Sequence, residues 1–131
     1  MFNLSDKIAV VTGGSRGIGK SICLKMAERG ANIAIVYSSD DKTALETEKE
    51  ISQFGHEVKI YKCDVSQDSE VKNLITQIIN KFKKIDILVN NAGIRDDKLA
   101  FNMDYNCFNK IIQTNLIGTF NMIHHSYLNF I

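Results

Sequence analysis

Short apolar runs alternate with helical patterns along the whole chain. Four runs rich in Val and Ile have the length and composition of strands buried on both faces, and they lie at 8–11, 32–37, 58–63 and 85–89. Between and after them, apolar residues recur three or four positions apart, as on one face of a helix. These patterns predict helices at 17–28, from 41 to about 54, from just after Ser66 to 82, and from 105 to the end.

The alternation predicts an α/β domain with a parallel sheet, a Rossmann-like doubly wound fold. Right-handed crossovers give the strand order 3-2-1-4, with the later strands of such a fold absent. The 131 residues are enough for one domain with its own core. A ligand is expected over the carboxyl ends of the strands, at the switch point between the first and the fourth.

The stretch from Lys7 to Lys20 reads KIAVVTGGSRGIGK and places a glycine turn between a strand and a helix. Glycines let the backbone approach a pyrophosphate, and the free N–H groups at a helix start bind its charge. Gly13, Gly17 and Gly19 have the spacing Gly-x-x-x-Gly-x-Gly. A flexible surface turn is the alternative, and the strand and helix on either side argue against it.

Composition excludes several classes of partner. Hydrophobic residues make up 44% and charged residues 24%, and the net charge is +1, which gives no reason to expect nucleic acid or an anionic membrane surface. No apolar run has the length of a membrane span. The three cysteines are scattered, and the adjacent His124 and His125 point apart on a helix, so no metal site is expected. The predicted location is the cytoplasm, or the plastid stroma if a targeting segment has been removed.

Four motifs together resemble the short-chain dehydrogenase/reductase family, and the resemblance covers the whole chain. They are the glycine loop, Asp64-Val65 after the third strand, Asn90-Asn91-Ala92-Gly93 after the fourth, and Asn115-Leu116 in the last helix. Within the family, the stretch 86–94 with Asp97-Lys98-Leu99 and Met103 is most similar to bacterial and plastid 3-oxoacyl-[acyl-carrier-protein] reductases.

The resemblance implies a set of cofactor-binding residues: Gly13, Gly14, Ser15, Arg16, Gly17, Ile18, Gly19, Ser38, Asp64, Val65, Asn91, Ala92 and Gly93. Asp64 and Val65 would flank the adenine, and the Asn91–Gly93 loop would hold the ribose beside the nicotinamide. Two alternatives stay open. In the first, the Asn91 side chain only ties neighbouring strands together. In the second, Asp64 is a cap of the next helix, a role for which Ser66 competes.

The second strand ends without the acid that usually accepts a bond from the ribose 2′-hydroxyl of NAD. Asp40 lies beyond that strand end and is better placed to cap the following helix. Arg16 and Ser38 can both reach a 2′-phosphate, so NADP is the predicted cofactor and NAD the alternative.

Family chemistry needs a serine and a Tyr-x-x-x-Lys pair, in which lysine lowers the pKa of the proton-donating tyrosine. The residues four positions after the tyrosines are Asp41, Val65, Asn109 and Ile131, and Lys110 is five after Tyr105. Asn115 corresponds to the catalytic asparagine of the family, but without its lysine partner a structural role is expected.

The chain is therefore predicted to be the cofactor-binding half of an NADPH-dependent reductase, a fragment that is inactive alone. The complete enzyme would reduce a small-molecule or acyl-carrier-protein-linked 3-oxoacyl substrate and would form a homo-oligomer. The alternatives are a non-catalytic nucleotide-binding or interaction module, and a reductase for another ketone or alcohol.

Overall fold

The computed structural model describes residues 3–93 and 103–130. Its strands and helices follow the predicted alternation, and their order is β1 Ile8–Thr12, α1 Gly17–Glu28, β2 Asn32–Tyr37, α2 Asp41–Ser52, β3 Val58–Lys62, α3 Asp68–Phe82, β4 Ile87–Asn90, α4 Tyr105–Ile112, the π-helical turn η1 Gln113–Ile117, α5 Gly118–Ser126 and the 3₁₀ turn η2 Tyr127–Phe130. The motif residues 94 and 97–99 lie outside the described part. In that part, no helix is long and apolar enough to span a membrane.

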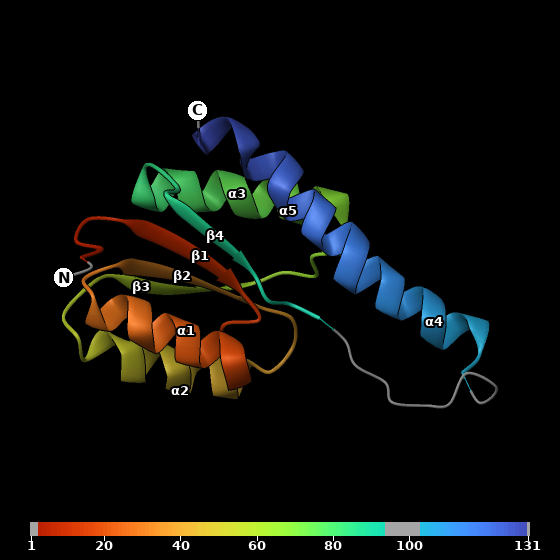
Figure 1. Cartoon of the computed structure of the whole chain (residues 1–131), viewed down its shortest axis with the longest axis horizontal. Helices are drawn as coiled ribbons and strands as arrows, with labels where there is room; N and C mark the ends of the chain where they lie inside the picture. The colour runs from red at the N-terminus through yellow and green to blue at the C-terminus, as the bar shows by residue number, and fades with distance from the viewer. Residues whose placement is uncertain (1–2, 94–102, 131) are drawn as a thin grey trace.

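The sheet is parallel and has the order β3-β2-β1-β4, which confirms the predicted doubly wound topology. Its register pairs Ile8 with Asn32 across β1 and β2, and Thr12 with Asn90 across β1 and β4. Helices α1 and α2 cover one face, and α3 and α5 cover the other (Figure 1). The α4 helix precedes α5 and is joined to its N-terminus through η1. It projects beyond the sheet on the side of the strands' carboxyl ends (Figure 1).

The central strand β1 is buried along its whole length because both faces of the sheet are covered. Ile8 and Val10 belong to the core on the α3 and α5 side, whereas Ala9 and Val11 belong to the core under α1 and α2. Successive side chains of a strand point to opposite faces, so an uninterrupted apolar run fills both cores. A continuous apolar run was therefore a correct indication of a central strand.

The last predicted helix is interrupted. A continuous α-helix was expected from 105 to the end, but the chain passes through the π-helical turn η1 between α4 and α5 and finishes in the 3₁₀ turn η2. An inserted π turn widens the helix locally and occurs preferentially at functional sites. Apolar periodicity does not distinguish such a turn from an α-helix, so the sequence pattern missed it.

The fourth strand begins at Ile87, two residues later than predicted, and the preceding Asp86 joins it to β1. Its backbone N–H donates to the Ile8 carbonyl oxygen at 2.9 Å, and its carboxylate Oδ2 accepts from the Ile8 N–H at 2.9 Å. Lys84 lies 3.1 Å from the same oxygen. Burial raises the pKa of Asp86, but the Ile8 N–H and the Lys84 ammonium outweigh it and hold that pKa below its ordinary value.

Asp86 should therefore make the stability of the domain sensitive to acid. Its stabilisation is fully present above the unfolded pKa of about 3.9 and is lost as the pH falls through the lower folded pKa. We expect Asp86→Asn to lower the free energy of unfolding at neutral pH by about 0.5–1 kcal/mol. Urea unfolding between neutral pH and pH about 3 should show a flatter acid dependence in the variant. Parallel curves for both proteins would contradict the assignment.

Candidate functional site

A pocket of about 890 Å³ lies at the carboxyl ends of the strands. It is lined by the loops that follow β1, β2, β3 and β4 and by residues of α4 and η1. All the predicted cofactor-binding residues line this pocket except Gly14 and Gly19. The structure therefore brings motifs from four separate loops together at the position where a doubly wound fold binds its ligand.

The glycine loop turns sharply because Gly13 has φ +65°, a conformation that side chains rarely adopt. Its N–H donates to the Val36 carbonyl oxygen at 2.8 Å, which joins the loop to the end of β2. Gly19 sits beneath the loop, where an added Cβ would overlap the Gly13 carbonyl and come within 2.5 Å of Asn91 Nδ2. A Cβ on Gly14 would be less crowded, at 3.0 Å from Cys23 Sγ. The two glycines that do not line the pocket thus set the shape of the loop that does.

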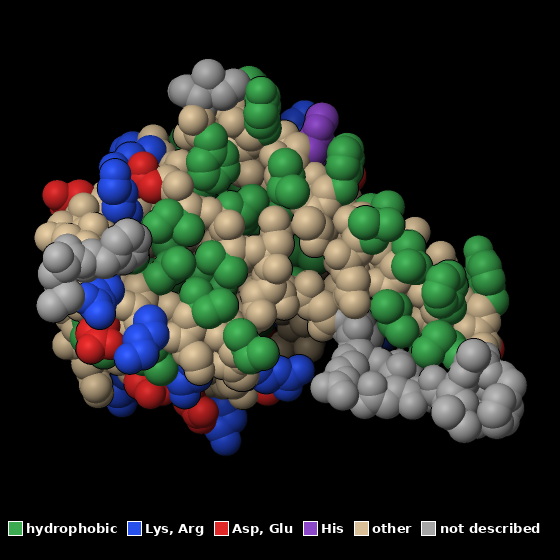
Figure 2. Space-filling model, viewed as in Figure 1, with side chains coloured by type: hydrophobic (Ala, Val, Ile, Leu, Met, Phe, Trp, Pro, Cys, Tyr) green, Lys and Arg blue, Asp and Glu red, His purple; other side chains and the backbone are tan. Residues whose placement is uncertain are grey.

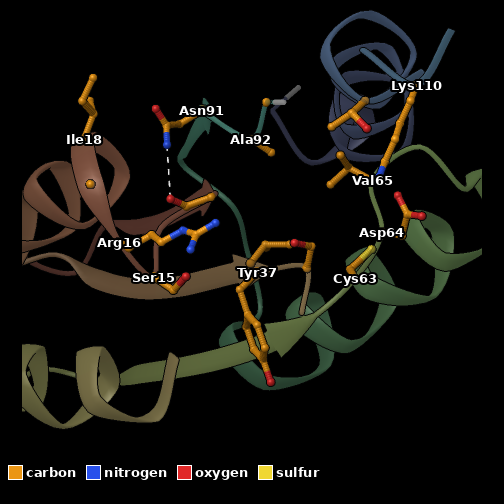
Figure 3. Close-up of a pocket in the computed structure, with 16 residues that line it drawn as sticks. Ser15, Arg16, Ile18, Tyr37, Cys63, Asp64, Val65, Asn91, Ala92 and Lys110 are labelled. Carbon is orange, nitrogen blue, oxygen red and sulfur yellow. Dashed lines mark hydrogen bonds between the residues drawn. The ribbon is translucent and has the colours of Figure 1, made fainter. Parts of the chain in front are cut away.

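Thr12 joins the glycine loop to the end of β4. Its buried hydroxyl oxygen accepts from the backbone N–H groups of Asn91 at 3.0 Å and Ala92 at 2.9 Å. The Asn91 Nδ2 in turn donates to the Gly13 carbonyl oxygen at 3.2 Å (Figure 3). The Asn91 side chain therefore joins the loop after β4 to the loop after β1, which confirms the structural role considered for it. Its contact with a ribose stays a prediction. The sequence did not indicate that the Thr12 hydroxyl would bond the loop after β4.

Helix α2 holds the glycine loop from the other side. The buried Thr47 hydroxyl donates to the Ser15 carbonyl oxygen at 2.6 Å. The neighbouring Arg16 carries its guanidinium into the pocket (Figure 3). Asp40 caps α2 as predicted, since its carboxylate accepts from the Thr43 N–H at 3.0 Å and from the Thr43 hydroxyl at 2.7 Å. Those bonds hold the pKa of Asp40 below its ordinary value.

The loop after β3 is fixed by an internal turn and by α5. Asp64 Oδ1 accepts from the Ser66 N–H at 3.0 Å and from its hydroxyl at 2.7 Å, an Asx turn. The N-cap of α3 is Gln67, so the alternative that Asp64 or Ser66 caps this helix is wrong. The buried Asn121 Nδ2 donates to the Val65 carbonyl oxygen at 2.9 Å. Gly118 brings α5 close, because a Cβ there would lie 2.6 Å from Val65 Cγ2.

The described lining also includes residues outside the cofactor-binding set that the family resemblance implies, namely Val36, Tyr37, Cys63, Lys110 and Thr114. Val36 and Tyr37 end β2 and Cys63 directly follows β3, at the strand ends where a ligand was expected. Burial raises the pKa of the Cys63 thiol to about 12. The thiol is therefore neutral at physiological pH and lines the pocket without acting as a nucleophile. Lys110 and Thr114 are one helical turn apart and reach the pocket because α4 and η1 extend over it (Figure 3).

Asn115 lies in the π-helical turn η1 and is absent from the described lining of the pocket. Its side chain lies beside the Asn91–Gly93 loop, since a Cβ built on Gly93 would be 3.3 Å from Asn115 Oδ1. The structure thus places it next to the loop of the predicted nicotinamide ribose. Its structural or catalytic role stays a prediction.

The histidines of α5 have ordinary partners. His125 Nε2 lies 2.7 Å from Asp68 Oδ1 on α3, and the His124 ring stacks on Phe120 with 5.4 Å between the ring centres. Across residues 3–93 and 103–130, no three His, Cys, Asp or Glu side chains are grouped to hold a metal ion. In the described lining of the pocket, the charged side chains are those of Arg16, Lys110 and Asp64.

Comparison with known proteins agrees with this architecture. The profile of the family described as short chain dehydrogenase matches residues 7–131. The 3-oxoacyl-[acyl-carrier-protein] reductase FabG of Staphylococcus epidermidis is 42% identical over 118 residues, which are 90% of this chain and 48% of that protein. The chain therefore spans about half the length of this relative.

Two solved structures carry bound dinucleotides. An NAD⁺-bound xylitol dehydrogenase superposes with a TM-score of 0.93 at 26% identity, covering 98% of this chain and 49% of that one. A short chain dehydrogenase from Burkholderia cenocepacia in complex with NADP has a TM-score of 0.92 at 28% identity, covering 98% and 52%.

The chain belongs to the short-chain dehydrogenase/reductase family, whose members are oxidoreductases that bind NAD or NADP. Among the relatives compared, its sequence is similar to the FabG reductases of two staphylococci.

Proposed function

We propose that the pocket binds NADPH and that the chain is the cofactor-binding part of a reductase for 3-oxoacyl thioesters. The observation that carries the proposal is the convergence of the glycine loop, the Asp64-Val65 loop and the Asn91–Gly93 loop on one pocket. The N-terminus of helix α1 suits a pyrophosphate. The helix starts at Gly17 beside the pocket and has no acidic residue in its first turn, so its N–H groups can bind an anion.

The cations and acids near the end of β2 support NADPH over NADH. Arg16 and Ser38 line the pocket, whereas Asp40 is absent from its described lining and is engaged with Thr43. A 2′-phosphate in this part of the pocket would meet a guanidinium, which binds phosphate through charge-assisted hydrogen bonds. A carboxylate in the same place would repel it.

Bound NADPH supplies a hydride, and the residues of this chain would hold it in position. The glycine loop and Arg16 would bind its phosphates, and the Asn91–Gly93 loop would orient the nicotinamide end. The sequence contains no Tyr-x-x-x-Lys to deliver a proton to the substrate oxygen. We therefore propose that the chain of 131 residues binds the cofactor and does not reduce a 3-oxoacyl thioester.

The proposed substrate and assembly rest on the similarity to the FabG reductases and on one surface feature. Hydrophobic side chains gather in a band along α4 and α5 (Figure 2). Phe108, Leu116 and Phe120 are 53%, 61% and 59% exposed. Apolar patches of this kind mark interaction sites, which supports the predicted homo-oligomer. An acyl-carrier-protein-linked substrate and a cytoplasmic location stay predictions.

The cofactor preference is tested by titrating the chain with NADPH and with NADH while following nicotinamide fluorescence. We expect NADPH to bind about tenfold more tightly, and Arg16→Leu to remove most of that difference by weakening NADPH alone. Arg29→Leu, at the exposed far end of α1, is the matched control and should change neither constant. Equal affinities in the unmodified chain would contradict the NADPH assignment, and consumption of NADPH with a 3-oxoacyl thioester would contradict the predicted inactivity.

A further inference from the structure

Helix α4 contributes a cation to the pocket that no sequence motif indicated. Lys110 lines the pocket together with Thr114, one helical turn further along. Its side chain runs from α4 toward the loop that carries Asp64 and Val65 (Figure 3). Most of the described lining comes from the strand ends and the glycine loop, whereas Lys110 comes from α4.

Lys110 is one of the charged side chains in the described lining of the pocket. In the described lining, the basic side chains are Arg16 on the glycine loop and Lys110 on α4, and the acidic one is Asp64. The ion pairs found within residues 3–93 and 103–130 do not include Lys110. Lys110 lies on the side of the pocket where Asp64, the acidic residue of the described lining, would otherwise repel an anion.

The position along the ligand follows from the topology and rests on the proposed function. A dinucleotide in this fold crosses the switch point between β1 and β4. Its nicotinamide half would lie toward the Asn91–Gly93 loop, and its adenosine half toward the Asp64-Val65 loop. The Lys110 side chain extends from α4 toward the second of these loops (Figure 3).

We infer that Lys110 is a binding residue for the adenosine half of the dinucleotide. Its ammonium group attracts the polyanionic ligand and offsets the Asp64 carboxylate, and its aliphatic stem covers the adenine beside Val65. The interaction is electrostatic and partly exposed to solvent, so it weakens as salt is added.

The test compares Lys110→Met with Lys110→Arg, with Lys72→Met on the exposed face of α3 as the matched control. Dissociation constants are measured for NADPH and for 2′-phospho-ADP-ribose, which lacks the nicotinamide. At low salt Lys110→Met should weaken both ligands about threefold to fivefold, as expected for one partly exposed charge. Lys110→Arg should restore binding to within about twofold, and Lys72→Met should leave it unchanged.

Each other result overturns a defined part of the inference. Unchanged affinities in Lys110→Met, with the unmodified chain binding NADPH normally, overturn the role of Lys110 and leave the proposed function intact. Weaker NADPH binding with unchanged 2′-phospho-ADP-ribose binding overturns its placement at the adenosine half. An unmodified chain that binds neither ligand overturns the proposed function and the inference together. Circular dichroism of Lys110→Met, Lys110→Arg and Lys72→Met establishes that each variant is folded.

Discussion

Replacing Gly19 by Ala is expected to abolish dinucleotide binding and to lower the free energy of unfolding by about 3 kcal/mol. An added Cβ would overlap the Gly13 carbonyl and lie within 2.5 Å of Asn91 Nδ2. The first atom belongs to the backbone and the second donates to that same carbonyl, so neither can move away without opening the pocket. Urea unfolding and NADPH titration of the same variant measure the two effects.

Ser21→Ala is the control for this substitution because it lies in the same helix and is exposed. Its hydroxyl bonds only the Gly17 carbonyl of the preceding turn, and Ala is the better helix former. We expect its free energy of unfolding and its affinity for NADPH to match those of the unmodified chain. A Gly19→Ala variant that behaves like Ser21→Ala would show that the loop is not packed as described.

Replacing Thr12 by Val is expected to have the second large effect, although the two side chains have nearly the same shape. Thr12 is 1% exposed, and its hydroxyl accepts from the N–H groups of both Asn91 and Ala92. Valine leaves these two donors without an acceptor, at about 1–2 kcal/mol each, so the free energy of unfolding should fall by about 2–4 kcal/mol. The Asn91–Gly93 loop should also lose its position, which weakens NADPH binding.

Thr76→Val makes the same chemical change on the exposed face of α3. The Thr76 hydroxyl bonds only the Lys72 carbonyl within its own helix. We expect a change in the free energy of unfolding within about 0.5 kcal/mol. If Thr12→Val lowers the free energy of unfolding no more than Thr76→Val does, then Thr12 does not hold the end of β4.

The sheet and most of the pocket could be predicted from the sequence because local pattern and chain topology determine them together. Apolar runs identify buried strands, and a Rossmann-like arrangement with right-handed crossovers predicts the order 3-2-1-4. Once β1 and β4 are neighbours, the loops after them must meet, so Arg16 and Asn91 were correctly expected at one edge of the sheet.

The contribution of the last helices could not be predicted in the same way. Lys110 and Asn121 act through the way α4, η1 and α5 pack over the strand ends, and that arrangement depends on tertiary contacts such as Gly118 against Val65. The helical pattern shows which residues share a face but not which neighbour that face meets. Thr12 was missed for a related reason, since a threonine in an apolar strand indicates burial and does not reveal which groups its hydroxyl bonds.

The central claim is that NADPH binds over the strand ends, and NMR of the ¹⁵N-labelled chain tests it most directly. Titration with NADPH should shift the backbone amide signals of the Gly13–Ile18, Asp64-Val65 and Asn91–Gly93 loops in one saturable process, with Lys110 and Thr114 among the shifted residues. Signals at the far end of the sheet, such as those of Glu57 and Val58, should stay in place. Saturable shifts confined to another surface, or none at all, would contradict the claim.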